Sequence, residues 1–79
     1  EILQQSKYHH LRKLNVYNNI NIKSVNHLAN SLIELNCGKY CGINQDGIKD
    51  LKILQKLNIS SNQKIKNLDH MANSLIDLD

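Results

Sequence analysis

The chain has 79 residues, a formal net charge of +3 at pH 7, no Trp or Phe and three Tyr, so any core it forms must be aliphatic. A chain of this length supports at most one small domain, near the lower limit for a self-supporting core. Acidic residues are interspersed with the basic ones, which argues against the clustered basic footprint of a nucleic-acid binder. No apolar run approaches the ~20 residues of a membrane span.

The N-terminal residues 1–10 fit the pattern of the rest of the chain poorly, so we expect them to be a degenerate or preceding repeat unit, or a cap. The sequence shows no secretory signal peptide, although it begins with Glu rather than Met. Because residue 79 also stops in mid-strand, we expect a fragment cut from a longer array. Two cysteines suit free thiols in a reducing compartment better than a disulfide framework. We therefore expect an intracellular protein, in the cytoplasm or in the cytoplasm of a host.

From Leu11 onward the sequence repeats itself. Residues 11–36 recur at 54–79, at a fixed offset of 43 residues. A finer period lies within this block, because a Leu-x-x-Leu motif, continued by an apolar residue at its sixth position wherever the chain extends that far, begins four times. Its starts define units 11–31, 32–53, 54–74 and the beginning of a further unit at 75–79. The fourth and sixth positions of each motif are two apart, as on one side of a β-strand. The pattern predicts stacked units that bury their apolar sides against one another.

The units differ in the segment that returns from one strand to the next. Units 11–31 and 54–74 have apolar residues at spacings of three, which predicts a tight return with at most one turn of helix. Their ninth residues, Asn19 and Asn62, are expected to hydrogen-bond backbone groups of neighbouring units. The middle unit has Tyr40 at its ninth position, with Cys41 next to it.

For this middle unit we expect a return helix over about 47–53. Asp46 is its predicted N-cap, and Ile48 and Leu51 are its predicted buried residues. Gly38 and Gly42 are expected to serve the turn that leaves the strand, where a positive φ is needed.

The Leu-x-x-Leu-x-Leu pattern at this spacing resembles the leucine-rich repeat family, over residues 11–79. The resemblance implies an α/β solenoid with parallel strands on a concave face and short helices or turns on the convex face. The unit 32–53 looks like the cysteine-containing repeats of F-box partner proteins, through Ile43, Gly47, Ile48 and Leu51. The Asn-rich, alternating style is similar to leucine-rich repeat proteins of giant amoeba viruses.

The family resemblance implies a non-catalytic module that binds a protein partner on its concave face, and one form of this role is substrate recognition within a larger protein. The third positions of the units alternate in charge, as Lys13, Glu34, Lys56 and Asp77. This column is either a cross-strand ion-pair ladder or a surface that recognises a partner. The asparagines at the fifth positions are expected to be solvated or paired with each other through their amides; they are Asn15, Asn36 and Asn58. The candidate partner-binding residues are Arg12, Lys13, Tyr17, Glu34, Asn36 and Lys56.

Other chemistry finds little support in the sequence. The metal-binding residue types are His9, His10, His27, His70, Cys37 and Cys41. Cys37 points inward at a sixth position while His10 precedes a first position, about 20 Å apart along the strand direction at ~3.3 Å per residue. The glycines lack the spacing of a phosphate-binding loop. We expect no enzyme, metal site or cofactor. Two alternatives stay open: a nucleic-acid or polyanion binder using Arg12, Lys13, Lys39 and Lys56, or a purely structural array.

Overall fold

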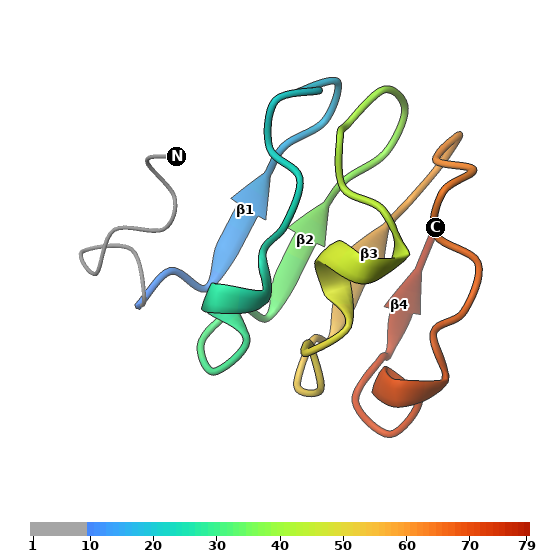
Figure 1. The fold of residues 1–79 in the computed structure, drawn as a ribbon. Coiled ribbons are helices and arrows are strands. Elements are labelled where there is room, and N and C mark those ends of the chain that lie inside the picture. Colours follow the sequence, from blue (N-terminus) through green and yellow to red (C-terminus); the bar gives the residue numbers. More distant parts are fainter. Residues whose placement is uncertain (1–9) are drawn as a thin grey trace.

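The computed structural model describes residues 10–79, which form one parallel sheet and the segments that connect its strands (Figure 1). The strands are β1 (Lys13–Asn15), β2 (Glu34–Asn36), β3 (Lys56–Asn58) and β4 (Asp77–Leu78), arranged in that order. Three 3-10 helices lie in the returns: η3 (Asn26–Leu28), η4 (Gln45–Ile48) and η5 (Asp69–Met71). This arrangement agrees with the coarse expectation of an α/β repeat. The expected degenerate unit lies, except for His10, outside the described residues.

The strands pair in register, so that equivalent positions of the repeat lie side by side. Leu14 pairs with Leu35, Leu35 with Leu57, and Leu57 with Leu78. Side chains alternate along a strand, which puts this leucine row on the inner face and the flanking polar positions on the other. Leu35 and Leu57 are buried in the middle of the row, while Leu78 at the β4 edge is 51% exposed.

The first and fourth residues of each motif are leucines that face inward, although two residues lie between them. The hydrogen bonds of the backbone explain how both can face the same side. The carbonyl oxygen of Arg12 accepts hydrogen bonds from the N–H groups of both Ile33 and Glu34, at 2.7 and 3.0 Å. The same pattern recurs at the next two junctions, where the carbonyls of Ile33 and Gln55 each accept two. Two residues thus oppose one carbonyl, as in a β-bulge. The first leucine of every motif can therefore face inward although three positions separate it from the fourth.

The core lies between the sheet and the return segments. Each return contributes a fully buried side chain from its 3-10 turn: Leu28 from η3, Ile48 from η4 and Met71 from η5. Burying such a side chain stabilises the fold by about 1.5–3 kcal/mol. The core is aliphatic, as composition predicts, and two cysteines, Cys37 and Cys41, complete it.

The tight returns predicted for units 11–31 and 54–74 are confirmed, because η3 and η5 are single 3-10 turns. The predicted burial of Ile48 and Leu51 is also confirmed. The predicted helix over 47–53 is wrong, since the middle unit too has only one 3-10 turn. A helix continuing through this segment would pair the Asp46 carbonyl with the Asp50 N–H, and the Asn26 side chain of the neighbouring return binds both groups instead.

The predicted N-cap of the middle return is also wrong. Asn44 has the extended backbone of an N-cap, and its side-chain oxygen accepts a hydrogen bond from the Gly47 N–H at 3.0 Å. Asp46 lies inside the turn, exposed, and its carboxylate is 3.7 Å from the Lys49 ammonium. The cap must precede the turn, and the turn begins two residues earlier than the sequence suggested.

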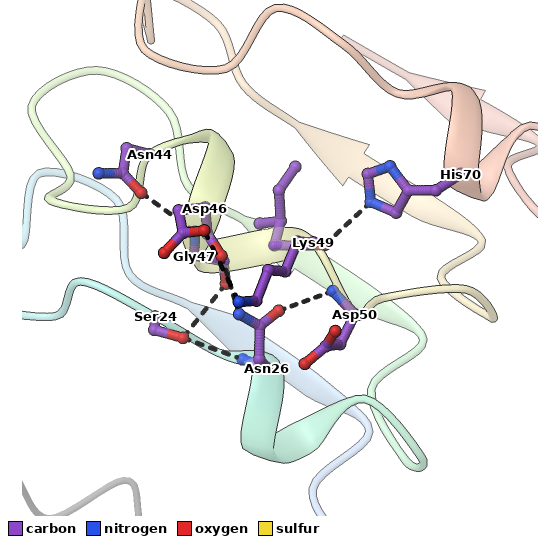
Figure 2. A network of polar contacts seen from close by, with 9 residues as sticks. Ser24, Asn26, Asn44, Asp46, Gly47, Lys49, Asp50 and His70 are labelled. Carbon is purple, nitrogen blue, oxygen red and sulfur yellow. Dashed lines mark hydrogen bonds and ion pairs between the residues drawn. The ribbon is translucent and has the colours of Figure 1, made fainter.

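Polar side chains tie each return segment to the next (Figure 2). Asn26 reaches from η3 to the middle unit, where its amide donates to the Asp46 carbonyl and accepts from the Asp50 N–H, both at 2.9 Å. Nε2 of His70 lies 2.9 Å from the Ile48 carbonyl oxygen, so this nitrogen carries the proton. His70 therefore belongs to the framework that joins neighbouring returns. His27, its counterpart, has a buried Nε2 without a hydrogen-bond partner in the structure.

The expected role of the ninth-position asparagine is confirmed at Asn62. Its buried amide nitrogen donates to the carbonyl oxygens of Cys37 and Ile43, at 2.9 and 3.2 Å, and so joins the third unit to the second. Asn19 instead accepts from the Asn21 N–H and is exposed.

In the middle unit, Cys41 and not Tyr40 takes the equivalent position. The Cys41 thiol accepts from the N–H two residues later, at Ile43, as the Asn62 oxygen accepts from Lys64. The thiol also donates to the Cys37 carbonyl, with 3.1 Å between sulfur and oxygen. The unit has one residue more than its neighbours, and this residue is accommodated in the turn between Gly38 and Cys41. Tyr40 is displaced to the surface.

The expectation that glycines supply positive φ is wrong. None of the three glycines has a positive φ, and the left-handed positions are instead Asn18, Lys39 and Ser61, one in each turn after a strand. The glycines instead allow neighbouring backbone segments to approach each other closely. A Cβ at Gly42 would overlap the Ile20 carbonyl oxygen and lie 2.8 Å from that of Ile22. Neighbouring units are thus in backbone contact at this point.

We expect Gly42→Ala to lower the free energy of unfolding by about 1–3 kcal/mol, because the added methyl group forces two backbone segments apart. Gly38→Ala is the matched comparison, since it changes the unfolded chain in the same way. Its Cβ would make a tight contact with the Ser60 carbonyl oxygen at 3.0 Å but no overlap, so its loss of stability should be smaller. Urea denaturation measures both. A variant at Gly42 as stable as the one at Gly38 would contradict the backbone contact.

We also expect Asn62→Ala to lower the free energy of unfolding by at least ~2 kcal/mol, because two buried carbonyl oxygens lose their donor. Asn19→Ala, the same substitution at the exposed equivalent position, should cost less than about 1 kcal/mol. Urea denaturation of the two variants gives the two losses of unfolding free energy. Equal losses would show that the amide bonds between units contribute nothing beyond the local turn.

Candidate interaction surface

The outer face of the sheet carries a row of polar side chains, which line a shallow depression of about 360 Å³. The strand register places the third-position residues next to one another, Lys13 beside Glu34, Glu34 beside Lys56, and Lys56 beside Asp77. The predicted alternation of charge across the strands is therefore present in space. We call this surface the polar sheet face. Its lining residues are Lys13, Leu14, Asn15, Glu34, Leu35, Asn36, Lys56, Leu57, Asn58, Asp77 and Asp79.

The charges on this face are only partly paired with each other. The Lys13 ammonium lies 3.5 Å from a Glu34 carboxylate oxygen. Among residues 10–79, the only other ion pair within 4.0 Å is the one between Lys49 and Asp46 on the return side. The predicted cross-strand ladder therefore contains one ion pair, between β1 and β2. The side chains of Lys56 and Asp77 remain at longer separation although their strands pair directly.

The fifth-position asparagines are neither a simple solvated column nor an amide-paired ladder. The side-chain oxygens of Asn15, Asn36 and Asn58 accept from the N–H groups two residues later, at 2.9, 3.2 and 2.9 Å respectively. These are Asx-turns, which end each strand by offering its backbone a local partner. The asparagine oxygens are therefore engaged in the turn, and the amide nitrogens are the groups left to face outward contacts.

Four of the six candidate contact residues line the depression: Lys13, Glu34, Asn36 and Lys56. Arg12 and Tyr17 are exposed but lie outside its lining. Tyr17 instead lies near Lys39 of the next unit, whose ammonium is 5.9 Å from the ring centroid. Sequence reasoning placed Tyr17 and Arg12 in one patch and did not single out Tyr40, whose ring centroid is 5.7 Å from the same ammonium. The extra residue of the middle unit was the signal that could have indicated this turn.

The two cysteines are buried and unpaired. Burial raises the pKa of the Cys37 thiol well above its ordinary value, and the neighbouring Cys41 thiol raises it further. Cys37 is therefore a neutral thiol at physiological pH, and a neutral thiol is a poor nucleophile and metal ligand. Both side chains act as small apolar core residues, with Cys41 adding the hydrogen bonds described above.

A second polar depression, of about 550 Å³, lies on the return side of the chain. It is lined by Gln45, Asp46, Lys49, Asn67, Asp69 and His70. Gln45 is already engaged there, because its side chain donates to the Asn67 carbonyl and accepts from the N–H groups of Lys66 and Asn67. Within residues 10–79, no three His, Cys, Asp or Glu side chains are grouped so that they could hold a metal ion. The described part of the chain contains no helix long and apolar enough to cross a membrane.

Comparison of the chain with models of known protein families, with curated proteins and with solved structures found no match.

The ion pair on the polar sheet face leads to a prediction. A double-mutant cycle of Lys13→Ala and Glu34→Ala should give a coupling energy of about 0.2–1 kcal/mol at low salt, because the pair is close but accessible to water. The coupling should shrink in 1 M NaCl, where the screening length is about 3 Å. Urea denaturation of the four proteins provides the energies.

The matched control is the cycle of Lys56→Ala and Asp77→Ala, which joins the same kinds of group across the β3–β4 pair at longer separation. Its coupling should be smaller. If the two cycles give equal couplings, the charge pattern acts through the average field of the sheet and not through the Lys13–Glu34 contact.

Proposed function

We propose that the chain is part of a leucine-rich repeat solenoid and that its polar sheet face is the concave surface that binds a protein partner, without catalysis or a cofactor. The repeated motif, the parallel register and the bulge at every strand junction support the repeat assignment. Each feature recurs at each described junction, as expected of units built on one plan. Residues 11–79 then form successive units of one array.

The observation that carries the binding proposal is the mixed composition of the depression over the sheet. Both signs of charge and several amide groups line it, from four neighbouring strands. Such a surface fits a partner of mixed polarity, which a protein offers and a nucleic-acid backbone does not. Lys56 and Asp77 strengthen the proposal, because charges without an ion-pair partner in the described residues are the ones a partner can engage at least cost.

A purely structural array is the second candidate, and one observation favours it. The ion pair between Lys13 and Glu34 shows that the face can satisfy part of its own charge. On that reading the alternation fixes strand register and keeps the sheet soluble. We place the protein inside a cell in either case, because two buried unpaired thiols in the core suit a reducing compartment.

The test is recovery of partners from a cell extract on the immobilised protein, at low and at high salt. The face variant carries Lys13→Ala and Lys56→Ala. Lys52→Ala with Lys66→Ala is the control, since both lysines are exposed, both lie outside the depression, and the change in net charge is the same. A protein retained at high salt should fall about tenfold or more with the face variant and less than about twofold with the control.

Two results would contradict the proposal. Recovery of nucleic acid alone, lost at high salt and reduced equally by both variants, would indicate a general polyanion binder. Recovery of no macromolecule that distinguishes the two variants would leave the structural array as the better account.

A further inference from the structure

The turns that follow β1, β2 and β3 lie side by side at one end of the sheet (Figure 1). We call residues 16–22, 37–43 and 59–65 the strand-exit loops. They are joined by backbone hydrogen bonds: the Lys39 N–H donates to the Ser60 carbonyl at 2.6 Å, and the Gly42 N–H donates to the Asn19 carbonyl at 2.9 Å. The loops therefore form one continuous and well-supported surface, separate from the polar sheet face.

Aromatic and apolar side chains gather on this surface. Tyr17 is 51% exposed, Ile20 57% and Tyr40 67%. These three are half of the exposed large hydrophobic residues of the described chain, and all lie in the first two strand-exit loops. Solvent-facing Tyr side chains held on a rigid backbone are typical anchors of protein interfaces.

A lysine lies between the two tyrosines. The Lys39 ammonium is 5.9 Å from the ring centroid of Tyr17 and 5.7 Å from that of Tyr40, within cation–π range of both. Its backbone has φ of 55°, an uncommon conformation for Lys. The turn thus fixes the backbone of Lys39, and the two rings hold its ammonium group between them.

The charge of the strand-exit loops has one sign. They contain Lys39 and Lys64 and no Asp or Glu. The Lys64 ammonium donates to the Cys41 carbonyl of the preceding unit at 3.0 Å, and Cys41 directly follows Tyr40 in the chain. Asp79, which follows β4, is the acidic residue that approaches this end of the sheet, through its backbone contact with Ile59. The surface around Tyr40 therefore offers two cations and exposed apolar groups together.

We propose that the strand-exit loops form a second contact surface, centred on Tyr17, Lys39 and Tyr40, which binds an acidic protein segment carrying an aromatic or aliphatic residue. The carboxylates of such a segment match Lys39 and Lys64, and its apolar residue packs on the tyrosines and Ile20. A single-stranded nucleic acid fits less well, because it is bound along a groove of several cations that follow its backbone, and Lys39 and Lys64 are the only basic residues of the strand-exit loops. This inference rests on the proposed protein-binding function and names the chemistry of the partner.

The test uses NMR spectra of the isotope-labelled protein, which has 79 residues and is small enough for each amide signal to be followed. The probes are a blocked 12-residue peptide of Asp, Glu, Tyr and Leu, the same peptide with Lys at every acidic position, and a 12-nucleotide oligothymidine. We expect the acidic peptide alone to bind appreciably. Its shift changes should centre on Tyr17, Lys39, Tyr40 and Lys64.

Variants then test the named side chains. Tyr40→Ala and Lys39→Gly should each weaken binding of the acidic peptide about fivefold or more, and the glycine keeps the left-handed turn available. Ile53→Ala is the control, because Ile53 is also an exposed apolar residue but lies outside the strand-exit loops. It should change the affinity less than about twofold. The dispersion of each spectrum shows whether the variant is folded.

Tighter binding of oligothymidine than of the acidic peptide overturns the inference, and so does the absence of peptide binding. Shift changes centred on Lys13 and Lys56 also overturn it, but they support binding of protein at the polar sheet face. The recovery experiment with the face variant therefore separates a failure of this inference from a failure of the proposed function.

Discussion

In-register pairing of four very short parallel strands is the constraint on which the rest of the molecule depends. Each strand has two or three residues, too few to be stable alone, and each exposes an inward leucine that only its neighbours can cover. The register aligns these leucines in a row. Because the row must continue from unit to unit, every return segment has to bring the chain back over the same distance and bury an apolar residue on the way.

The details of each unit are consequences of that register. Backbone segments of neighbouring units come so close at Gly42 that no side chain fits there. The carbonyl groups that face the interior between the second and third units receive hydrogen bonds from the buried amide of Asn62. The middle unit has one extra residue, and it keeps the register by turning Tyr40 outward. The Cys41 thiol there accepts the backbone hydrogen bond that an asparagine oxygen accepts in the neighbouring units.

The same constraint separates two surfaces of different chemistry. On the polar sheet face, equivalent positions of successive strands lie side by side, so the alternation of Lys and acidic residues along the sequence becomes a mixed surface in space. At the strand-exit loops the units differ in length and in residue type, and there the charge is positive and the aromatic residues collect. One sheet can thus have a regular, partly self-paired face and an irregular edge where the units differ.

The sequence alone predicted the features that depend on spacing within a unit. These include the four strand positions, the inward leucines, the alternating charges, the amide of Asn62 and the burial of Ile48 and Leu51. Each follows from the two-residue alternation of a strand or from comparison of one copy of the repeat with another. Such information is local, and the repeat supplies it several times over. Neither the register nor the core needed knowledge of distances between remote segments.

Only the tertiary structure decided what depends on contacts between units. The N-cap of the middle return lies at Asn44, and the turn after it stays short because the Asn26 side chain of the neighbouring return binds the Asp46 carbonyl and the Asp50 N–H. Gly42 and Gly47 are required by backbone contact with the preceding unit. Likewise, Tyr17 and Lys39 belong to different units, and a cation between two rings cannot be inferred from either unit alone. The sequence determined the repeat and its inward face by itself, because alternation is a local property of the backbone. The two candidate contact surfaces were decided by the stacking of units, because stacking sets which remote side chains become neighbours.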